Sequence, residues 1–394
     1  MKIAVFTKST TLHKGHGGLE TQNKELCEGL SKRGHKITIF SPKKDLEFDK
    51  FEENGINYVF IDADYKNYIL SPFLKNSWSK RSLEIFSELQ KKEKFDLVLG
   101  QSSAAESIIE NKNKLEVKTV SISHGTTLSE FNTFVKNISD IKDLYWLVRN
   151  FQYFIRQYFG RQRRFVLHSD KVIAVSQYVK KALISETFVD ERRVEVVHNG
   201  VDGNPYKIEK NSRDIGGLVH IYFIGRIERS KGILTIIDIV NKIDRDVVLH
   251  VVGAGPCQKE AEKMVAKYKI QEKVIFHGKM PHYEFIKKVH PDIFVFPTKR
   301  VEGFPMVIVE AMFAGMPTVA FDCGGVSDAV IDEETGFLID AGKEEEFKEK
   351  LEKLIDDFDM RQKFGRNSKE IAEKDYTIGT MVDRYEKIFT EVLE

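Results

Sequence analysis

The chain has 394 residues, more than the roughly 250–300 that one hydrophobic core usually serves, so we expect two domains. Hydrophobic residues make up 41% and charged residues 31%, which is typical of a globular protein and excludes a disordered chain. Lysine and arginine number 61 against 60 aspartate and glutamate residues, so the net charge gives no argument for nucleic acid as a partner.

The N-terminal segment and the cysteines indicate where the protein resides. Residues 1–6 are too short for a signal peptide and are typical of a buried strand. No window contains the roughly 18 uninterrupted apolar residues of a membrane-spanning helix. The three cysteines, Cys27, Cys257 and Cys323, are far apart and odd in number, as in reduced thiols, and form no zinc motif. The sequence therefore predicts a cytoplasmic protein.

Short apolar runs alternate with longer amphipathic stretches through the first 200 residues. Residues 19–32 have helical spacing, and Gly34 is a plausible helix stop. Repeated alternation of strand and helix predicts a parallel sheet covered by helices. The runs predicted as strands are 3–6, 37–40, 58–61, 97–99, 120–123, 172–175 and 194–197.

The same alternation restarts after a run of turn-forming residues at 199–205. The second series of predicted strands is 220–224, 247–252, 274–277, 293–296, 318–321 and 337–339. We expect two Rossmann-like, doubly wound α/β domains at 1–200 and 201–375 that face each other across a cleft. A helix at 376–394 would pack back toward the first domain. Ligands of such sheets bind at the carboxyl ends of the strands.

Two glutamates flank the predicted start of a helix after the strand at 293–296. Glu302 lies in the preceding loop, and Glu310 lies five residues into the helix that Pro305 opens. At 1.5 Å per residue this separation is about 7–8 Å, which suits hydrogen bonds to two polyol groups of one ligand. The N–H groups from Phe304 to Val307 would favour an anion between them. The alternative is two exposed surface glutamates, but Glu310 stands in an apolar run where an unpaired carboxylate is costly.

A basic loop follows the first strand of the second series. Arg226 and Lys231 stand at the carboxyl end of that strand. A guanidinium can grip a diphosphate in bidentate fashion, and an ammonium acts as a point charge. The alternative interpretation is an ordinary basic surface loop.

Two features of the first series complete the candidate site. Gly17 and Gly18 precede the helix at 19–32, where glycines let the backbone approach a phosphate or a sugar closely, or serve only a tight turn. His124 follows the strand at 120–123 and can donate to a sugar hydroxyl or a phosphate, although a lone histidine is more often structural.

Together these motifs resemble the retaining glycosyltransferases of the GT-B fold, the family 4-like enzymes with the E-x₇-E motif. Glu302 and Glu310 match that motif, and Arg226 and Lys231 match its Arg and Lys pair for the diphosphate. Further matches occur in the order that the family has them: Gly17-Gly18, His124, and the signatures at 172–176, 199–202, 322–328 and 335–338. E-x₇-E alone is a weak signal, but the ordered set covers essentially the whole chain.

The resemblance implies transfer of a sugar from a nucleoside diphosphate sugar to a hydroxyl acceptor, with retained configuration. The leaving phosphate itself would help to deprotonate the acceptor, so no protein nucleophile, metal or other cofactor is implied. The three D-x-D matches, at 62–64, 244–246 and 357–359, are interpreted as solvated turns. Two other classes stay open: a sugar-nucleotide epimerase of the same fold, and a non-catalytic sugar-nucleotide-binding subunit.

The resemblance also implies a role for each matching residue. Arg226 and Lys231 would bind the diphosphate, Glu302 the donor-sugar hydroxyls, and Glu310 the ribose. Gly17 and Gly18 would approach the diphosphate and the acceptor side, and His124 the donor sugar near the reacting carbon. The implied catalytic residues are His124, Arg226, Lys231 and Glu302, and the implied donor-binding residues are Gly17, Gly18, Arg226, Lys231, Glu302, Phe304, Pro305, Met306, Val307 and Glu310.

A stretch from Leu144 to Arg164 is rich in aromatic residues and has five arginines and no acidic residue. We expect it to dock on an anionic membrane surface, apolar side down, and to bring a lipid-linked acceptor to the first domain. The protein would then act at the inner face of the membrane. The alternative is a long helix buried against the first sheet with its arginines reaching outward.

Overall fold

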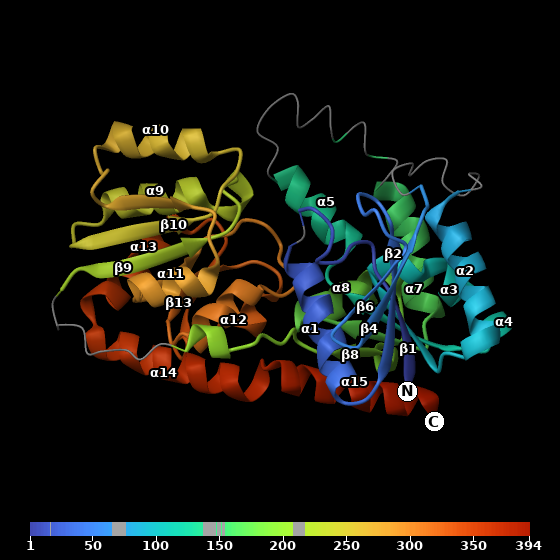
Figure 1. Cartoon of the computed structure of the whole chain (residues 1–394). Coiled ribbons are helices and arrows are strands. Elements are labelled where there is room, and N and C mark those ends of the chain that lie inside the picture. Colours follow the sequence, from blue (N-terminus) through green and yellow to red (C-terminus); the bar gives the residue numbers. More distant parts are fainter. Residues whose placement is uncertain (16, 65–75, 137–146, 148–150, 152–153, 208–216) are drawn as a thin grey trace. The chain divides into compact units, whose positions relative to one another are not determined.

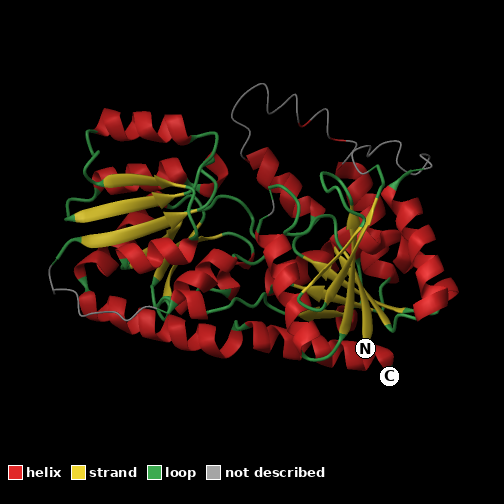
Figure 2. Ribbon diagram, in the orientation of Figure 1, coloured by secondary structure: helices red, strands yellow, loops and turns green. Residues whose placement is uncertain are grey.

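The computed structural model describes residues 1–394 except 16, 65–75, 137–146, 148–150, 152–153 and 208–216. It divides into two compact units. The N-terminal unit comprises Met1–Gly200 together with Ile378–Glu394, and the second unit comprises Val201–Thr377. Each unit is a sheet with helices on both sides (Figures 1 and 2), so the predicted α/β class with two parallel-sheet domains is confirmed.

The N-terminal sheet has eight strands in the order β3-β4-β2-β1-β5-β6-β7-β8. The strands are β1 (Lys2–Phe6), β2 (Lys36–Pro42), β3 (Lys50–Glu53), β4 (Ile56–Ile61), β5 (Leu97–Gln101), β6 (Lys118–Ser123), β7 (Lys171–Ala174) and β8 (Val194–Val196). All neighbours pair in parallel except β3, which is antiparallel to β4. The parallel strands are buried apolar runs, as a sheet covered on both faces requires. The sequence analysis missed β3 because this edge strand is polar and exposed.

The helices of this unit lie between strands along the chain, except the last, which follows the second unit (Figure 1). They are α1 (Gly18–Lys32), α2 (Trp78–Glu93), α3 (Glu106–Glu110), α4 (Lys112–Leu115), α5 (Thr127–Lys136), α7 (Arg163–His168), α8 (Gln177–Thr187) and α15 (Ile378–Leu393). Short 3₁₀ turns cover Ser102–Ala105 and Glu191–Arg193, and a π-helical turn covers Gln157–Gln162. Helix α15 packs on α1, where a Cβ at Gly29 would lie 2.6 Å from Cγ2 of Val382.

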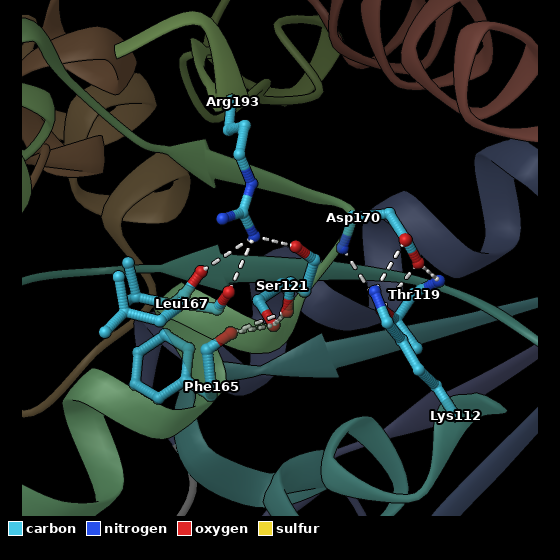
Figure 3. Close-up of polar contacts among 9 residues, drawn as sticks. Lys112, Thr119, Ser121, Phe165, Leu167, Asp170 and Arg193 are labelled. Carbon is cyan, nitrogen blue, oxygen red and sulfur yellow. Dashed lines mark hydrogen bonds and ion pairs between the residues drawn. The ribbon is translucent and has the colours of Figure 1, made fainter. Parts of the chain in front are cut away.

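Polar contacts tie the amino ends of β6 and β7 together (Figure 3). Asp170 accepts hydrogen bonds from Lys112 Nζ at 2.6 Å, Thr119 N at 2.8 Å and Thr119 Oγ1 at 2.9 Å. Arg193 donates to the carbonyls of Leu167, at 3.0 Å, and Ser169. These bonds connect β6 to the residues before β7 and β8, and so help to hold this edge of the sheet together.

The second sheet has six parallel strands in the order β11-β10-β9-β12-β13-β14. They are β9 (Val219–Ile224), β10 (Val247–Val252), β11 (Val274–Gly278), β12 (Ile293–Phe296), β13 (Thr318–Asp322) and β14 (Gly336–Asp340). The order reverses between β9 and β12, and ligands of doubly wound sheets bind beyond the carboxyl ends of strands at such a switch point.

Helices flank this second sheet as well (Figure 2). They are α9 (Ile233–Lys242), α10 (Gln258–Tyr268), α11 (His282–Val289), α12 (Met306–Phe313), α13 (Glu344–Asp356) and α14 (Phe358–Asp375). Short 3₁₀ turns cover Asn204–Tyr206, Arg229–Lys231 and Gly325–Asp328. The chain passes from the second unit to the N-terminal unit between Thr377 and Ile378.

Candidate active site

The loops that follow β9 and β12 meet at the switch point of the second sheet. Lys231 ends the 3₁₀ turn after β9, and Glu302 stands in the loop after β12. Lys231 Nζ lies 2.6 Å from Glu302 Oε1, and the side chains are 20% and 17% exposed. The structure therefore brings together the lysine predicted to bind phosphate and the glutamate predicted to bind sugar, and pairs them with each other.

Two glycines allow the backbone of these loops to approach so closely. Gly232 has φ +77°, and a Cβ there would lie 1.8 Å from the carbonyl oxygen of Pro297. Gly324 has φ +74°, and a Cβ there would lie 2.3 Å from the carbonyl oxygen of Glu302. Glu302 also bonds through its backbone to Cys323 and Gly325, at 3.2 and 2.8 Å. Because any larger residue would collide with backbone atoms, both glycines help to hold the pair in position.

Glu310 has a partner that the sequence analysis missed. His282, the first residue of α11, donates a hydrogen bond from Nδ1 to Glu310 Oε2. The two side chains are 28% and 15% exposed, so the carboxylate that stood out in an apolar run is half-buried and paired. Burial, and then the charge of Glu310, raise the pKa of the neighbouring Tyr222 phenol. A spacing of 28 residues follows no local periodicity, so no sequence signal marks the contact.

Arg226 is held differently from Lys231. Its side chain is 72% exposed, and its Nε lies 3.6 Å from Glu228 Oε2. An exposed pair at this distance has little effect on where the side chain points. The guanidinium is therefore open to solvent, whereas the Lys231 ammonium is half-buried.

The start of α12 differs from the prediction. The helix begins at Met306, with Pro305 as its N-cap residue, and Ile308 N already donates to Pro305 O at 3.0 Å. Phe304 and Pro305 are buried and precede the helix, so the helix begins one residue later than expected, and the role of these two residues in donor binding stays a prediction. Met306 and Val307 form the first turn of the helix.

In the N-terminal unit Gly17 and Gly18 lie at the start of α1, as expected from their place in the chain. Gly17 is the N-cap residue, and its N–H donates to Glu20 Oε2 at 2.9 Å. Its φ of −140° is an extended conformation that any residue can adopt, so the backbone angle does not itself require glycine.

His124 follows β6 at the carboxyl edge of the N-terminal sheet. Its Nε2 lies 2.6 Å from Oε1 of Gln101, the last residue of β5. Burial lowers the pKa of His124 to about 4, so the imidazole is neutral at pH 7. The sequence analysis did not single out Gln101, because a buried glutamine at a strand end has no spacing signal.

Family models match both halves of the chain. The model described as Glycosyltransferase Family 4 matches residues 16–204, and the one described as Glycosyl transferases group 1 matches residues 207–371. The chain belongs to the GT-B glycosyltransferases. The predicted resemblance to family 4-like glycosyltransferases of the GT-B fold and the predicted enzyme class are thereby confirmed.

Relatives span the whole length of this glycosyltransferase. N-acetyl-alpha-D-glucosaminyl L-malate synthase of Bacillus anthracis is 23% identical over 97% of this chain and 96% of its own. Sucrose-phosphate synthase from Thermosynechococcus elongatus superposes with a TM-score of 0.79 at 18% identity, covering 99% of this chain and 98% of that one. Anabaena HepE in complex with UDP superposes with a TM-score of 0.73 at 19% identity, covering 99% and 100%.

The predicted membrane segment of the glycosyltransferase is described only in part. Residues 144–146, 148–150 and 152–153 lie outside the described residues. In the remainder, Phe151, Ile155 and Phe159 are 48%, 44% and 67% exposed. Phe154 is buried, and its ring centroid lies 5.1 Å from that of Phe131 on α5.

Three arginines of this segment contact other parts of the N-terminal unit. Arg161 and Arg164 lie 3.4 and 3.0 Å from the buried Glu106 carboxylate, and Arg163 donates to the carbonyl of Glu186 at 3.2 Å. Arg161 is 13% exposed and Arg164 is 43% exposed, and the contact of these arginines with a membrane stays a prediction. A carboxylate that is only 9% exposed needs cationic partners, and it draws Arg161 inward.

Two further observations concern metals and membranes. In the described ranges, no three His, Cys, Asp or Glu side chains are grouped so as to hold a metal ion. Every helix among the described residues is too short or too polar to cross a bilayer.

A cavity of about 910 Å³ opens at the amino ends of β5 and β6, the edge opposite His124. Its lining includes Gln90, Lys112, Lys118 and Asp170. None of the predicted site residues lines it, so we do not assign the reaction to it.

Proposed function

We propose that this glycosyltransferase moves a sugar from a nucleoside diphosphate sugar to a hydroxyl acceptor, with retained anomeric configuration. The observation that carries the proposal is the Lys231–Glu302 pair at the switch point of the second sheet. The donor has an anionic diphosphate and a sugar with several hydroxyls. The Lys231 ammonium suits the diphosphate, and the Glu302 carboxylate suits the hydroxyls.

Donor binding would exchange the partners of this pair. The diphosphate replaces the Glu302 carboxylate beside Lys231, and Glu302 is released to accept hydrogen bonds from sugar hydroxyls. Arg226, which is exposed, adds a second cation and a bidentate grip. Both cations would stabilise the negative charge that grows on the leaving diphosphate.

Glu310 would bind the ribose hydroxyls through its carboxylate. His282 holds one carboxylate oxygen, which leaves the other oxygen to accept from the ribose. Met306 and Val307, in the first turn of α12, direct N–H groups toward the anionic part of the donor. The backbone of Gly17 and Gly18 would approach the diphosphate and the acceptor side, and His124 would contact the donor sugar.

The reaction would need no cofactor. The acceptor hydroxyl attacks the anomeric carbon on the face from which the diphosphate leaves, and a phosphate oxygen takes the hydroxyl proton. The bond from the anomeric carbon to the phosphate oxygen breaks as the new glycosidic bond forms. Lys231 and Arg226 supply the positive charge that a divalent metal would otherwise provide.

A uridine nucleotide is a reasonable first donor to test. Anabaena HepE, which has the same fold, has been crystallised with UDP and with UDP-glucose. We would screen UDP-glucose, UDP-N-acetylglucosamine and GDP-mannose for protection against thermal unfolding, since a bound donor raises stability by mass action.

Turnover of the protective donor then tests the function. NMR of the product should show the anomeric configuration of the donor retained. An inverted product would refute the retaining mechanism. Conversion of the free donor to an isomer without acceptor would identify an epimerase, and donor binding without turnover would identify a binding subunit.

We further propose that the acceptor is lipid-linked and that the exposed apolar residues of the segment bind the membrane. Phe151, Ile155 and Phe159 are spaced four residues apart along the chain, and each is at least 44% exposed. A large exposed apolar patch marks an interaction surface. Apolar insertion thus replaces arginine contacts as the main source of membrane affinity.

Vesicle co-sedimentation tests this docking with an Ile155→Ser, Phe159→Ser double variant. We expect the wild type to sediment with anionic vesicles and the double variant to lose most of that binding. Leu218→Ser is the matched control, because Leu218 is 48% exposed but belongs to the second unit rather than to this segment. Equal sedimentation of all three proteins, or none by the wild type, would favour a soluble acceptor.

A further inference from the structure

A chain of buried amides connects α1 to His124. Gln101 and Asn23 are each 2% exposed. Gln101 Nε2 donates to Asn23 Oδ1 at 2.6 Å, and Gln101 Oε1 lies 2.6 Å from His124 Nε2. Cys27 Sγ, one turn further along α1, lies 3.9 Å from the same Asn23 oxygen. Three elements, α1, β5 and β6, are thus joined at the carboxyl edge of the sheet, beside its switch point between β1 and β5.

The direction of these hydrogen bonds determines which imidazole nitrogen carries the proton. An amide nitrogen only donates and an amide oxygen only accepts. Since Gln101 directs its nitrogen to Asn23, its oxygen faces the histidine, and His124 Nε2 must be the donor. Burial raises the pKa of the Cys27 thiol, so the thiol remains protonated and can donate to the Asn23 oxygen, which is consistent with this direction.

The other ring nitrogen then has the opposite character. A neutral imidazole carries one N–H, so when Nε2 holds it, Nδ1 is an acceptor. Burial alone lowers the pKa of His124 to about 4, and the ring is therefore uncharged across the physiological range. Donation to a sugar or phosphate, which the sequence analysis expected, is unavailable because the single N–H is directed to Gln101.

We propose that Gln101 is a positioning residue that fixes His124 as its Nε2–H tautomer, so that Nδ1 accepts a hydrogen bond from a hydroxyl of the sugar substrate. This inference rests on the proposed function only for the identity of the partner. It specifies that partner: a free hydroxyl fits, whereas a deoxy, O-methyl or carboxylate group at the same position lacks the hydrogen that Nδ1 requires. It also excludes His124 as an acid toward the leaving phosphate.

The tautomer can be measured without any substrate. Nitrogen-15 NMR of the full-length protein, labelled at histidine and assigned with a His124→Asn variant, distinguishes the two ring nitrogens. At pH 7 we expect a neutral ring with the hydrogen on Nε2. A hydrogen on Nδ1, or a protonated ring, would overturn the inference.

A matched substitution tests the consequence for turnover. Gln101→Glu keeps the length and the acceptor, and the Asn23 amide can rotate to donate to the new carboxylate. The negative charge favours the imidazolium, which turns Nδ1 into a donor. The acid limb of the kcat/KM profile for the protective nucleotide sugar should follow the His124 pKa, which is about 4 in the wild type. We expect Gln101→Glu to move this limb up by one or more pH units, so that kcat/KM falls at acid pH and recovers toward pH 8.5.

Two controls separate positioning from a loss of stability. Gln101→Met removes the acceptor at similar length and should lower kcat/KM at every pH. Gln90→Glu changes another buried glutamine, which donates to the carbonyls of Phe95 and Leu115 at 3.3 and 3.2 Å. It should lower the melting temperature and leave the pH profile unchanged.

The outcomes distinguish this inference from the proposed function. If the wild type turns over a nucleotide sugar and both Gln101 variants keep its pH profile and rate, the positioning role is wrong. If the wild type turns over none of UDP-glucose, UDP-N-acetylglucosamine and GDP-mannose, the proposed function loses its support, and the NMR measurement still decides the tautomer.

Discussion

In the second unit the two glutamates proposed to bind the donor are each hydrogen-bonded to a basic side chain. Lys231 contacts Glu302, and His282 contacts Glu310. In the N-terminal unit His124 is held by the neutral amide of Gln101, and burial keeps its pKa low. This difference between the two units corresponds to the part of the substrate that each unit is proposed to bind. Ion pairs can be exchanged for a diphosphate, whereas a neutral acceptor suits an uncharged hydroxyl.

The largest expected effect on activity comes from removing the carboxylate of the Lys231–Glu302 pair in the second unit. Glu302→Ala should lower turnover about 100- to 1000-fold, as loss of one group that orients and stabilises the transition state typically does. Nucleoside diphosphate affinity should not fall, because Lys231 no longer has to leave a carboxylate. Both quantities are measured on one preparation, with the exposed Glu334→Ala as control. Near wild-type turnover by Glu302→Ala would refute the assignment.

The backbone at Gly324 lies so close to Glu302 that adding one methyl group should lower the free energy of unfolding markedly. Gly324→Ala adds a Cβ 2.3 Å from the carbonyl oxygen of Glu302 at a positive φ, and we expect a cost of about 2–4 kcal/mol from strain and overpacking. Gly342→Ala is the control, because its φ is +93° and nothing lies within 4 Å of the added atom. Urea unfolding of both variants should therefore show the larger loss at Gly324. Equal losses would show that backbone conformation alone is responsible.

The second pair predicts a smaller effect on nucleotide binding. His282→Ala should weaken nucleoside diphosphate affinity about tenfold, since Glu310 loses the hydrogen bond that orients it. His282→Asn retains a donor and should restore part of the affinity. His290→Ala, at the other end of α11, serves as the control. The preference for ribose over 2′-deoxyribose should also decrease, and an unchanged preference would argue against a ribose contact at Glu310.

The neutral histidine predicts how stability depends on pH. The folded-state pKa of His124 is about 4, below the ordinary 6.5, so the unfolded state binds the proton more tightly. The stabilising contribution is complete above pH 6.5 and is lost as the pH falls from 6.5 toward 4. In a His124→Asn variant, chemical unfolding at pH 7 and pH 4.5 should differ less than in the wild type. The same pH dependence in both proteins would place the cause elsewhere.

The smallest expected effect is that of removing divalent metal. Because Arg226, Lys231 and helix N-termini are proposed to neutralise the diphosphate, activity in EDTA should remain close to that in its absence. The assay compares EDTA alone with EDTA followed by excess manganese. Abolition of activity with rescue by manganese would mean that the charge on the leaving group is neutralised by a metal.

Much of the fold could be predicted because buried parallel strands are continuous apolar runs. The predicted strands at 247–252 and 293–296 have the bounds of β10 and β12. Strand β3 was not predicted because it is exposed at the edge of the sheet and lacks the apolar run by which the buried strands were recognised. The start of α12 was displaced because Pro305 is compatible with both the N-cap and the first turn, and only packing of the buried Phe304 and Pro305 decides between them.

For the candidate site, the sequence supplied the residues that lie at strand ends but not the partners that hold them. Three of them, Glu302, Lys231 and His124, stand out because each follows a predicted strand. Glu310 stands out because it is a carboxylate in an apolar run. Arg161 and Arg164 stood out as a basic stretch, but their contacts with Glu106, 55 and 58 residues earlier in the chain, could not be predicted from the sequence.

The sequence by itself determined two parallel α/β domains, the family, and the strand ends that carry the chemistry, because these depend on periodicity and local order. Only the tertiary structure decided the contacts between Lys231 and Glu302, His282 and Glu310, and Gln101 and His124. These pairs are 71, 28 and 23 residues apart in the chain, so no local pattern encodes them. They form because the strand order of each sheet brings the ends of non-consecutive segments together, where half-buried charges and amides must find partners.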